Sequence, residues 1–330
     1  MFGRTRLIGF ALTLLFLGLA LWRVDLQEVG ATLSTANYTY VLPAALFTLV
    51  GYLWRTYRWR WILHPTKKVP VFSLFPVLMI GFMANNLLPA RIGEFVRAYV
   101  LHREQDVSKS LALGTIVLER LFDGLVLVAF LGGLSVFFPL PGWGAQIGWL
   151  SALVFVGSGV VVGIFLHERW TLGFIDVAGR PLPEKYGRWV RAKAEFFISG
   201  LDALRRYRRV VSISALSVII WLFEAMSYFV IIKGFSLPMS SLSMAFAAVF
   251  LLVVVNLGIM IPSAPGYIGT FQFFGVLALS AFGVKREVAL SIAIVSHTMQ
   301  YVMVTGIGLI LFWRHQLSFR RLREEAVDGA

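Results

Sequence analysis

The sequence contains no cysteine and few of the motifs that mark common enzymes. The absence of Cys among its 330 residues excludes disulfides, thiolate nucleophiles and zinc–thiolate sites. The phosphate-binding motif G-x-x-x-x-G-K-[ST], the nucleophile motif G-x-S-x-G and the zinc motif H-E-x-x-H are also absent. The five His residues are dispersed along the chain. We therefore expect no metal, no cofactor and no enzymatic activity.

Charged residues are also scarce, and hydrophobic residues dominate instead. Only 14% of the residues are charged and 58% are hydrophobic, with a mean hydropathy of +0.79. Runs such as 7–22 and 210–232 are apolar on every side and long enough to cross a bilayer. They do not alternate with period two, as barrel strands do. The composition predicts an all-α, polytopic membrane protein.

We predict about six full spans and two interrupted apolar blocks. The full spans are 7–22, 38–57, 111–137, 147–166, 211–232 and 288–313. The blocks, 69–101 and 242–281, are each broken near the middle by Pro and Gly. We interpret each block as a re-entrant hairpin that enters and leaves the membrane on the same side. Six crossings then place both termini together.

The distribution of basic residues orients this topology. The chain has 30 Lys and Arg against 17 Asp and Glu, a net charge of +13. In the predicted topology 23 basic residues lie on one side of the membrane and four lie on the other. Because basic residues accumulate in cytoplasmic loops, we expect both termini to be cytoplasmic in a cell (inner) membrane. The same asymmetry explains the basic charge without a nucleic-acid partner.

The two interrupted blocks resemble each other. At an offset of 176 residues, LPARIGEFVRAYVL (88–101) aligns with APGYIGTFQFFGVL (264–277), with six identities in fourteen positions. Each block follows one predicted span and precedes another. Three crossings separate the blocks, so the first hairpin would open to the cytoplasm and the second to the outside. An accidental match between two Pro-Gly kinks is the alternative explanation.

This order of elements predicts an inverted repeat of two halves. The first half, 1–140, contains spans 7–22, 38–57 and 111–137 and hairpin 69–101. The second half, 141–330, contains spans 147–166, 211–232 and 288–313, hairpin 242–281, a cytoplasmic amphipathic segment 185–209 and a basic tail. In many secondary transporters built from inverted repeats, broken helices meet near the midplane and form the substrate site.

The breaks in the two hairpins have the features of an anion site. Pro89 and Pro265 stand where a second half-helix would begin, a position that tolerates a missing N–H. The N-terminus of such a half-helix carries free N–H groups and a partial positive charge, which suits a lipid phosphate. Asn85, Asn86 and Ser263 add uncharged polar groups at the same depth. Non-helical backbone in a membrane must be covered by protein or line a wet cavity.

Charged residues inside the apolar segments fall on two helix faces. They are Arg91, Glu94, Arg97, Glu119, Arg120 and Asp123. The first three share an arc of about 120° on the first hairpin, and the last three share about 100° on the next span. We predict that the faces meet and bind substrate. Ion pairs that only lock the hairpin to the span are the alternative, and Arg97 could instead extend to the cytoplasmic surface.

Three further features lead to weaker predictions. Glu224 has no partner near it in the sequence, so it is a candidate for proton coupling together with Glu119 and Asp123, or a hydrogen-bonded structural residue. His297 is expected to make a helix–helix hydrogen bond rather than to bind a ligand. The aromatic run 52–61 is interpreted as an interfacial belt with basic anchors, and 185–209 as a basic amphipathic stretch along the inner leaflet.

Three motifs in order, NNLLPARIGEFVRAYVL, TIVLERLFDGLVLV and IPSAPGYIGTFQ, resemble the transmembrane flippase-like domain of lysyl-phosphatidylglycerol synthases and related stand-alone membrane proteins. The resemblance covers nearly the whole chain and implies lipid translocation between leaflets. It implies site residues at Arg91, Gly93, Glu94, Arg97, Glu119, Arg120, Asp123, Pro265, Gly266 and Gly269. Ala90, Tyr267 and Gln272 depart from the family pattern, which bears on the identity of the lipid. Nothing in this sequence resembles a soluble aminoacyl-transferase domain, so we do not expect lysyl transfer.

The leading hypothesis is a flippase for an anionic or phosphate-containing lipid, including glycolipids. Its substrate-binding residues would be the six charged candidates together with Asn85, Asn86, Ser263, Gly266 and Gly269. Transport would use an ion gradient or run downhill. The alternative is a non-catalytic membrane partner of an envelope glycosyltransferase or lipid-modifying enzyme, docked at 185–209. An intramembrane enzyme using Glu119, Asp123 and His297 is a third hypothesis.

Overall fold

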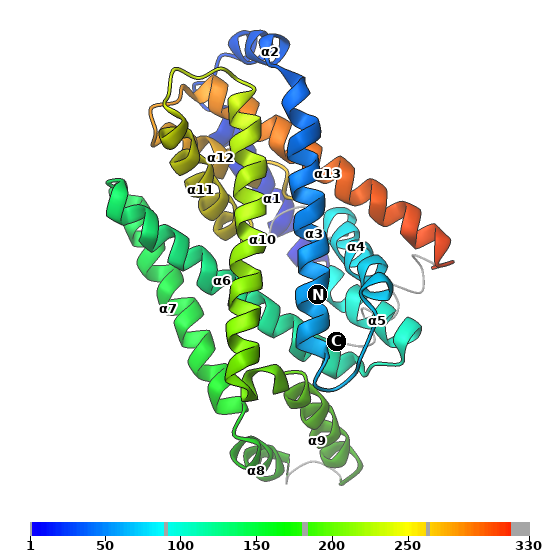
Figure 1. Cartoon of the computed structure of the whole chain (residues 1–330). Coiled ribbons are helices and arrows are strands. Elements are labelled where there is room, and N and C mark those ends of the chain that lie inside the picture. Colours follow the sequence, from blue (N-terminus) through cyan, green and yellow to red (C-terminus); the bar gives the residue numbers. More distant parts are fainter. Residues whose placement is uncertain (1, 89–91, 180–183, 262–264, 318–330) are drawn as a thin grey trace.

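The computed structural model describes residues 2–88, 92–179, 184–261 and 265–317, and every regular element in these ranges is a helix (Figure 1). The α-helices are α1 (Phe2–Leu21), α2 (Leu26–Thr35), α3 (Val41–Leu63), α4 (Val71–Leu87), α5 (Gly93–Gln105), α6 (Lys109–Phe137), α7 (Gly142–Phe165), α8 (Glu168–Gly179), α9 (Glu184–Ser199), α10 (Tyr207–Lys233), α11 (Ser241–Gly258), α12 (Thr270–Ser280) and α13 (Arg286–Arg314). Three 3₁₀ helices are η1 (Tyr38–Tyr40), η3 (Asp202–Arg205) and η4 (Pro265–Tyr267). The predicted all-α class is confirmed.

Five helices of the described chain are long and apolar enough to cross a membrane: α6, α7, α10, α11 and α13. Four of them coincide with predicted spans, whereas α11 is the first limb of the second interrupted block. The other two predicted spans correspond to α1 and α3. The apolar part of α1 is short, Ala11–Leu21, and α3 carries three arginines. The helices support a multi-pass membrane protein, and the count of six crossings stays a prediction.

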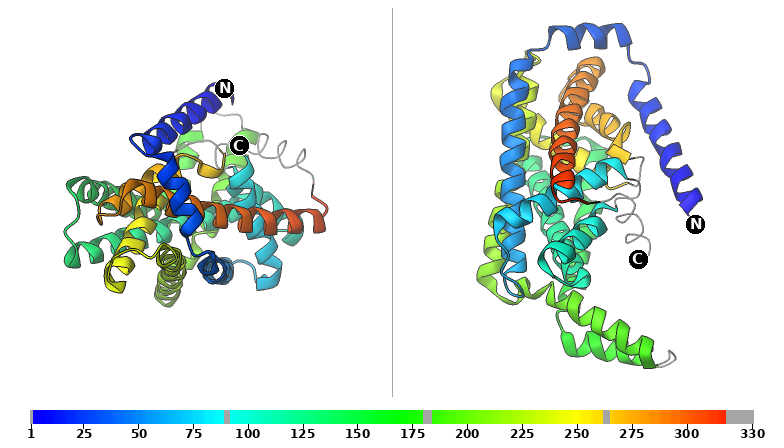
Figure 2. Two further views of the ribbon diagram at one scale, coloured as in Figure 1. Left: turned by 90° about the horizontal axis from the view of Figure 1, so that it is seen from above. Right: turned by 90° about the vertical axis from the view of Figure 1, so that its right-hand side faces the viewer.

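Helices α3 and α10 form a long antiparallel pair along one face of the bundle (Figures 1 and 2). At one end the Asn37 N–H donates to the Gly234 carbonyl at 2.9 Å. Further along, Thr48 Oγ1 donates to Ser227 Oγ at 2.9 Å. Gly51 faces α10, which allows a close approach. Small and hydroxyl-bearing residues pack helices in this way where surrounding lipid removes the hydrophobic drive for association.

The two interrupted blocks fold into helix pairs that enter the bundle from opposite ends. The loop before α4 lies beside the end of α9, where Thr66 Oγ1 donates to the Ser199 carbonyl. The loop before α11 lies at the other end of the α3–α10 pair, next to Gly234. The last turn of α4 packs against η4 of the second pair, and a Cβ on Gly266 would lie 3.4 Å from the Asn86 carbonyl oxygen. The end of α4 and the η4 turn therefore meet inside the bundle.

The α4–α5 pair is tight because two glycines face each other. A Cβ on Gly93 would lie 2.1 Å from the Gly81 carbonyl oxygen, and a Cβ on Gly81 would lie 2.9 Å from Arg97 Cβ. Asn85 Oδ1 accepts a 2.8 Å hydrogen bond from the Gly93 N–H, one of the amides that a helix N-terminus leaves without an internal partner. Asn85, predicted as a substrate ligand, thus also closes the turn between α4 and α5.

The amphipathic helices lie at the two ends of the bundle (Figure 2). Helix α2 crosses one end, and the α8–α9 pair projects from the other. Helix α9 is anchored on α6, because a Cβ on Gly114 would lie 2.4 Å from the Phe197 carbonyl oxygen. The predicted amphipathic segment 185–209 corresponds to α9, η3 and the first residues of α10. Helix α9 ends at Ser199, and η3 and the start of α10 at Tyr207 follow it.

We expect Gly93→Ala to destabilise the protein strongly, because its methyl group would overlap the Gly81 carbonyl. Overpacking of this kind costs about 1–3 kcal/mol of unfolding free energy. The matched control is Gly132→Ala on α6, where a Cβ meets nothing within 4 Å. Thermal unfolding of the two variants in detergent would compare them. Equal melting temperatures would contradict the tight α4–α5 packing.

Candidate functional site

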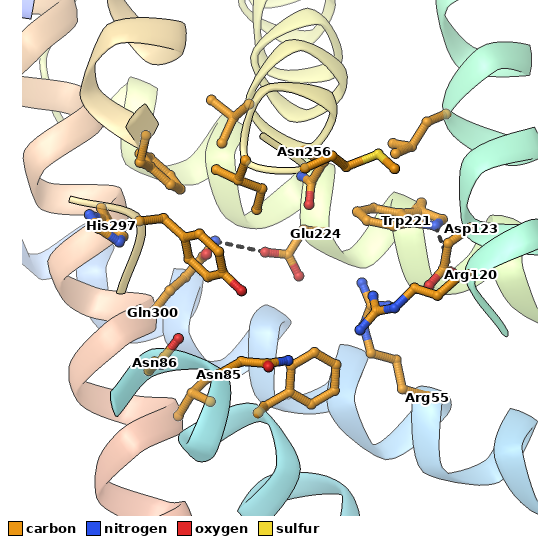
Figure 3. Close-up of a pocket in the computed structure, with 18 of the residues that line it drawn as sticks. Arg55, Asn85, Asn86, Arg120, Asp123, Trp221, Glu224, Asn256, His297 and Gln300 are labelled. Carbon is orange, nitrogen blue, oxygen red and sulfur yellow. Dashed lines mark hydrogen bonds and ion pairs between the residues drawn. The ribbon is translucent and has the colours of Figure 1, made fainter. Parts of the chain in front are cut away.

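A cavity of about 170 Å³ lies between the end of α4, the η4 turn and the surrounding helices α3, α6, α10, α11 and α13. Figure 3 shows that its polar lining divides into two parts. Arg55, Arg120 and Asp123 lie at one side, with Trp221 beside them. Carboxamide side chains and Glu224 face the rest of the space. The first part is called the arginine end below, and the second the carboxamide end.

Asp123 of α6 is the central acceptor of the arginine end. Its Oδ1 accepts hydrogen bonds from Arg58 Nη1 at 2.6 Å and from Trp221 Nε1 at 3.1 Å. Its Oδ2 lies 3.4 Å from Arg55 Nη1, and Arg58 also donates to Ser217 Oγ at 2.7 Å. Asp123 is 4% exposed and Arg58 is fully buried. One carboxylate therefore joins α3 and α10 to α6, and its pairing offsets the cost of burying the charges.

A second buried ion pair joins α5 to α6. Arg97 Nη1 and Nη2 donate to the two carboxylate oxygens of Glu119 at 3.0 and 2.8 Å, a bidentate geometry. The Arg97 guanidinium lies over the Trp59 ring, 3.6 Å from its centroid. Arg58 Nη2 is 3.7 Å from Glu119 Oε1, which connects this pair to Asp123. Arg97 is 2% exposed, so the suggestion that it extends to the surface is wrong.

The third pair, between α5 and α6, borders the cavity. Arg120 Nη2 lies 2.9 Å from Glu94 Oε1, and the two side chains are 38% and 24% exposed. Arg120 also lines the cavity (Figure 3). A pair with this exposure contributes less to stability than a buried one, so it can exchange partners at a lower free-energy cost.

The carboxamide end is built around Glu224 of α10, which is 8% exposed. Gln300 Nε2 of α13 donates to Glu224 Oε1 at 2.7 Å (Figure 3). No cation in the described part of the chain lies within ion-pair distance of this carboxylate. Asn86 Nδ2 donates to Thr305 Oγ1 at 3.0 Å, and Asn256 Nδ2 donates to the Leu252 carbonyl at 2.8 Å. The amide groups are thereby oriented.

Positive φ angles shape the turn of the second helix pair. Gly266 has φ 73° and Gly269 has φ 83°, and Tyr267 between them has φ 59°. This left-handed region is open to Gly but costs a bulky residue roughly 1–2 kcal/mol. Gln272 Oε1 accepts from the Gly269 N–H at 2.7 Å, and Gln272 Nε2 lies 3.1 Å from His297 Nδ1. The predicted helix–helix hydrogen bond of His297 is therefore confirmed.

The lining combines aromatic walls with a few oriented polar groups. Among the described residues, no group of three or more His, Asp or Glu side chains is placed to hold a metal ion. Asp123 is already held by arginines and Glu224 by Gln300. Aromatic walls with a few oriented polar groups are typical of small-ligand pockets.

One known protein family matches most of the chain. The family described as the lysylphosphatidylglycerol synthase TM region matches residues 6–308. The chain belongs to this family. The match confirms the resemblance carried by the three motifs, and it extends from α1 into α13. No solved structure matches the chain.

Several curated proteins are similar to this member of the lysylphosphatidylglycerol synthase TM family. Glycosyltransferase AglD of Haloferax volcanii is 27% identical, over 93% of this chain and 54% of AglD. A UPF0104 membrane protein of Methanothermobacter thermautotrophicus is 28% identical, over 86% of this chain and 87% of that protein. UPF0104 membrane protein MJ1595 of Methanocaldococcus jannaschii is 23% identical, over 87% and 88%. The chain thus spans about half of AglD and most of the UPF0104 proteins, and it is a multi-pass membrane protein.

The prediction that the two charged faces meet is confirmed in part. Arg97 meets Glu119 and Glu94 meets Arg120. Asp123 does not take part in these contacts and pairs with α3 instead. Of the five charged candidates that the structure describes, Arg120 and Asp123 line the cavity itself.

Other predicted site residues lie at the turns. Arg91 and Ser263 lie outside the described residues. Asn85 and Asn86 line the cavity. Gly266 lies against the Tyr301 ring, where a Cβ would be 2.8 Å from Cε2. Gly269 packs instead against α1, because a Cβ on Gly269 would lie 2.8 Å from the Thr13 carbonyl oxygen.

Sequence reasoning missed the contribution of α3. The aromatic run was predicted as an interfacial belt, which is wrong for Arg55, Arg58 and Trp59, because they are 6%, 0% and 0% exposed. Their spacing of three and four residues places them on one helix face, and this was the signal available in the sequence. Asn256 and Trp221 had no such signal, since Asn256 is a lone polar residue in an apolar run and Trp221 is one of several aromatic residues in another.

We expect Glu119→Gln to lower the free energy of unfolding by about 3–5 kcal/mol, because it leaves Arg97 and Arg58 buried without full pairing. The control is the same change at Glu94, whose pair is partly exposed and should contribute at most about 1 kcal/mol. SDS-induced unfolding in mixed micelles would measure both. A loss at Glu94 as large as that at Glu119 would contradict the buried network.

Proposed function

We propose that the protein moves a lipid with a polar or phosphate-bearing headgroup between the leaflets of the cell membrane. The observation that carries the proposal is the polar cavity inside an otherwise apolar helical bundle. Its volume, about 170 Å³, is below the range of about 300–1,000 Å³ typical of pockets for drug-sized ligands. It suits a headgroup, while acyl chains would stay in the surrounding lipid. No enzymatic step is required.

The arrangement of the helix pairs supports an inverted repeat of the halves 1–140 and 141–330. Helix α4 packs against α5 and α13, and α11 packs in the same way against α12 and α6. The central contact is between α3 and α10, which hold corresponding positions in the two halves. We propose that both helix pairs are re-entrant and that one half rocks against the other around the cavity. Such rocking is the general mode of alternating access.

The charged residues have separate roles in this proposal. The buried pairs of Asp123 and Glu119 hold the bundle together, and Arg120 with Glu94 and Arg91 would bind or release the phosphate. Glu224, which has no cation at ion-pair distance within the described chain, is the candidate for proton coupling. The sequence carries no phosphate-binding loop for ATP, so an ion gradient or a downhill lipid gradient would drive transport. The basic loops would face the cytoplasm together with both termini.

We expect Asn256→Phe to abolish lipid movement, because the larger side chain would fill the cavity that Asn256 lines. The assay is quenching of fluorescent lipid in the outer leaflet of proteoliposomes. The matched control is Gly157→Phe on α7, an open site where a Cβ meets nothing within 4 Å. Thermal unfolding would verify that both variants are folded. Wild-type rates in a folded Asn256→Phe protein would contradict transport through this cavity.

The same assay tests the predicted phosphate ligands. Arg91→Ala and Glu94→Gln should each slow the movement of a phosphate-bearing lipid, because they remove one donor and release Arg120 from its partner. Unchanged rates in both variants would reject the assignment of these residues to the site. Transport through the cavity would be rejected as well only if Asn256→Phe also left the rate unchanged.

A second candidate function is that of a membrane partner for a glycosyltransferase. It is favoured by the relative AglD, which is named a glycosyltransferase and of which this chain matches about half. The projecting α8–α9 pair would provide the docking surface (Figure 1). Co-purification of a glycosyltransferase with a protein that moves no lipid after reconstitution would favour this function over transport.

A further inference from the structure

The geometry points to a hydroxyl-rich headgroup, a sugar or cyclic polyol attached through phosphate, as the substrate of the cavity. The ring would occupy the carboxamide end, and the phosphate would lie at the arginine end. This inference rests on the proposed function and names its substrate class.

The first argument is the polarity of the hydrogen-bonding groups at the carboxamide end. One N–H of each amide group of Asn86, Asn256 and Gln300 donates within the protein, and each carboxamide NH2 carries a second N–H. Asn86 Oδ1, Asn256 Oδ1 and Glu224 Oε2 accept no hydrogen bond from any described residue. These oxygens belong to side chains that line the cavity. The end therefore presents acceptors beside amide donors, and it calls for a ligand that both donates and accepts.

A phosphate does not meet this requirement, because its ionised oxygens only accept. Hydroxyl groups both donate and accept, so a ring bearing several of them can satisfy separated acceptors from one rigid frame. A bare phosphate or a choline headgroup has no donor for Asn86, Asn256 or Glu224. Acceptors left unpaired away from water weaken the binding of such a ligand.

The second argument is the charge balance of the lining. Among the described residues, the charged ones on the cavity wall are Arg55, Arg120, Asp123 and Glu224, two of each sign. This part of the wall therefore carries no excess of negative charge that would select a cationic headgroup over a neutral ring. The arginines are concentrated at one end (Figure 3), and this position suits one phosphate next to the ring.

The third argument is the aromatic surface around the same space. Trp221, Tyr228 and Tyr301 line the cavity together with Tyr267. Aromatic side chains that present an apolar face and a polar edge match a sugar ring, whose C–H groups form apolar faces and whose hydroxyls lie at its edge. Tyr267 occupies this wall with φ 59°, a conformation that disfavours a bulky residue. The unfavourable backbone conformation thus occurs at a residue whose aromatic ring lines the cavity.

The test compares lipids with the same labelled acyl chains in phosphatidylcholine proteoliposomes. Phosphatidylinositol carries a phosphate and a hydroxyl-rich ring, phosphatidylcholine has no donor, and phosphatidylethanolamine carries an ammonium. We expect phosphatidylinositol to move about tenfold faster than the other two, as two additional hydrogen bonds of about 0.5–1.5 kcal/mol predict. Equal rates, or a preference for phosphatidylethanolamine, would overturn the inference.

Variants at the carboxamide end test the acceptor argument. Asn256→Leu removes one acceptor at similar size, and Glu224→Gln turns an acceptor into a donor. Each should lower the rate ratio of phosphatidylinositol to phosphatidylcholine from about tenfold to about threefold, because one of the two additional hydrogen bonds is lost. The ratio is measured within one preparation, so partial loss of folded protein does not change it. An unchanged ratio in both variants would overturn the assignment of the ring to this end.

A binding measurement separates this inference from the transport proposal. The soluble headgroups glycerophosphoinositol and glycerophosphocholine are added to the purified protein, and thermal unfolding is recorded. Selective stabilisation by glycerophosphoinositol without movement of any lipid would reject transport and retain the ligand class. Lipid movement without headgroup selectivity would retain transport and reject the ligand class. Stabilisation by neither headgroup and no lipid movement would reject both.

Discussion

The structure depends on a chain of buried charges that runs through α5, α6 and α3. Glu119 binds Arg97 and lies near Arg58, and Arg58 binds Asp123. Each of these groups would be expensive to bury alone, and breaking such a pair leaves an uncompensated charge. Three helices are therefore held in one register at the depth where the turns of the two helix pairs meet. The cavity has its position and its polar wall because this network fixes the surrounding backbone.

The network and the cavity also divide the charged residues by exposure. Buried pairs, such as Arg97 with Glu119, are structural elements of the bundle. The pair of Arg120 and Glu94 is more exposed to solvent, and Arg120 borders the cavity. Glu224, bound to an amide rather than to a cation, faces the cavity from the other side. Ligand recognition is thus assigned to the exposed edge of the network, where a change of partner costs less free energy.

The all-helical class and most helix positions followed from apolar runs, because a run that must satisfy its backbone in lipid has few alternatives to a helix. The meeting of the charged faces that carry Arg97 and Glu119 followed from the spacing of charged residues on two neighbouring helices, but the individual partners did not. The role of Asp123 did not follow, since its partners lie on α3, far away in the sequence. Helix periodicity places a residue on a face and does not identify the helix opposite. The site at Asn256 and Gln300 depended on such long-range packing.

The central claim is that a headgroup occupies the space between the end of α4 and η4. The most direct measurement is an electron cryo-microscopy map of the protein purified in its native lipid. The account predicts headgroup density within the cavity, between Arg120 and Glu224, with acyl chains leading out between helices. Lipid density only along the outer faces of the helices, with the cavity filled by water or by side chains, would contradict it.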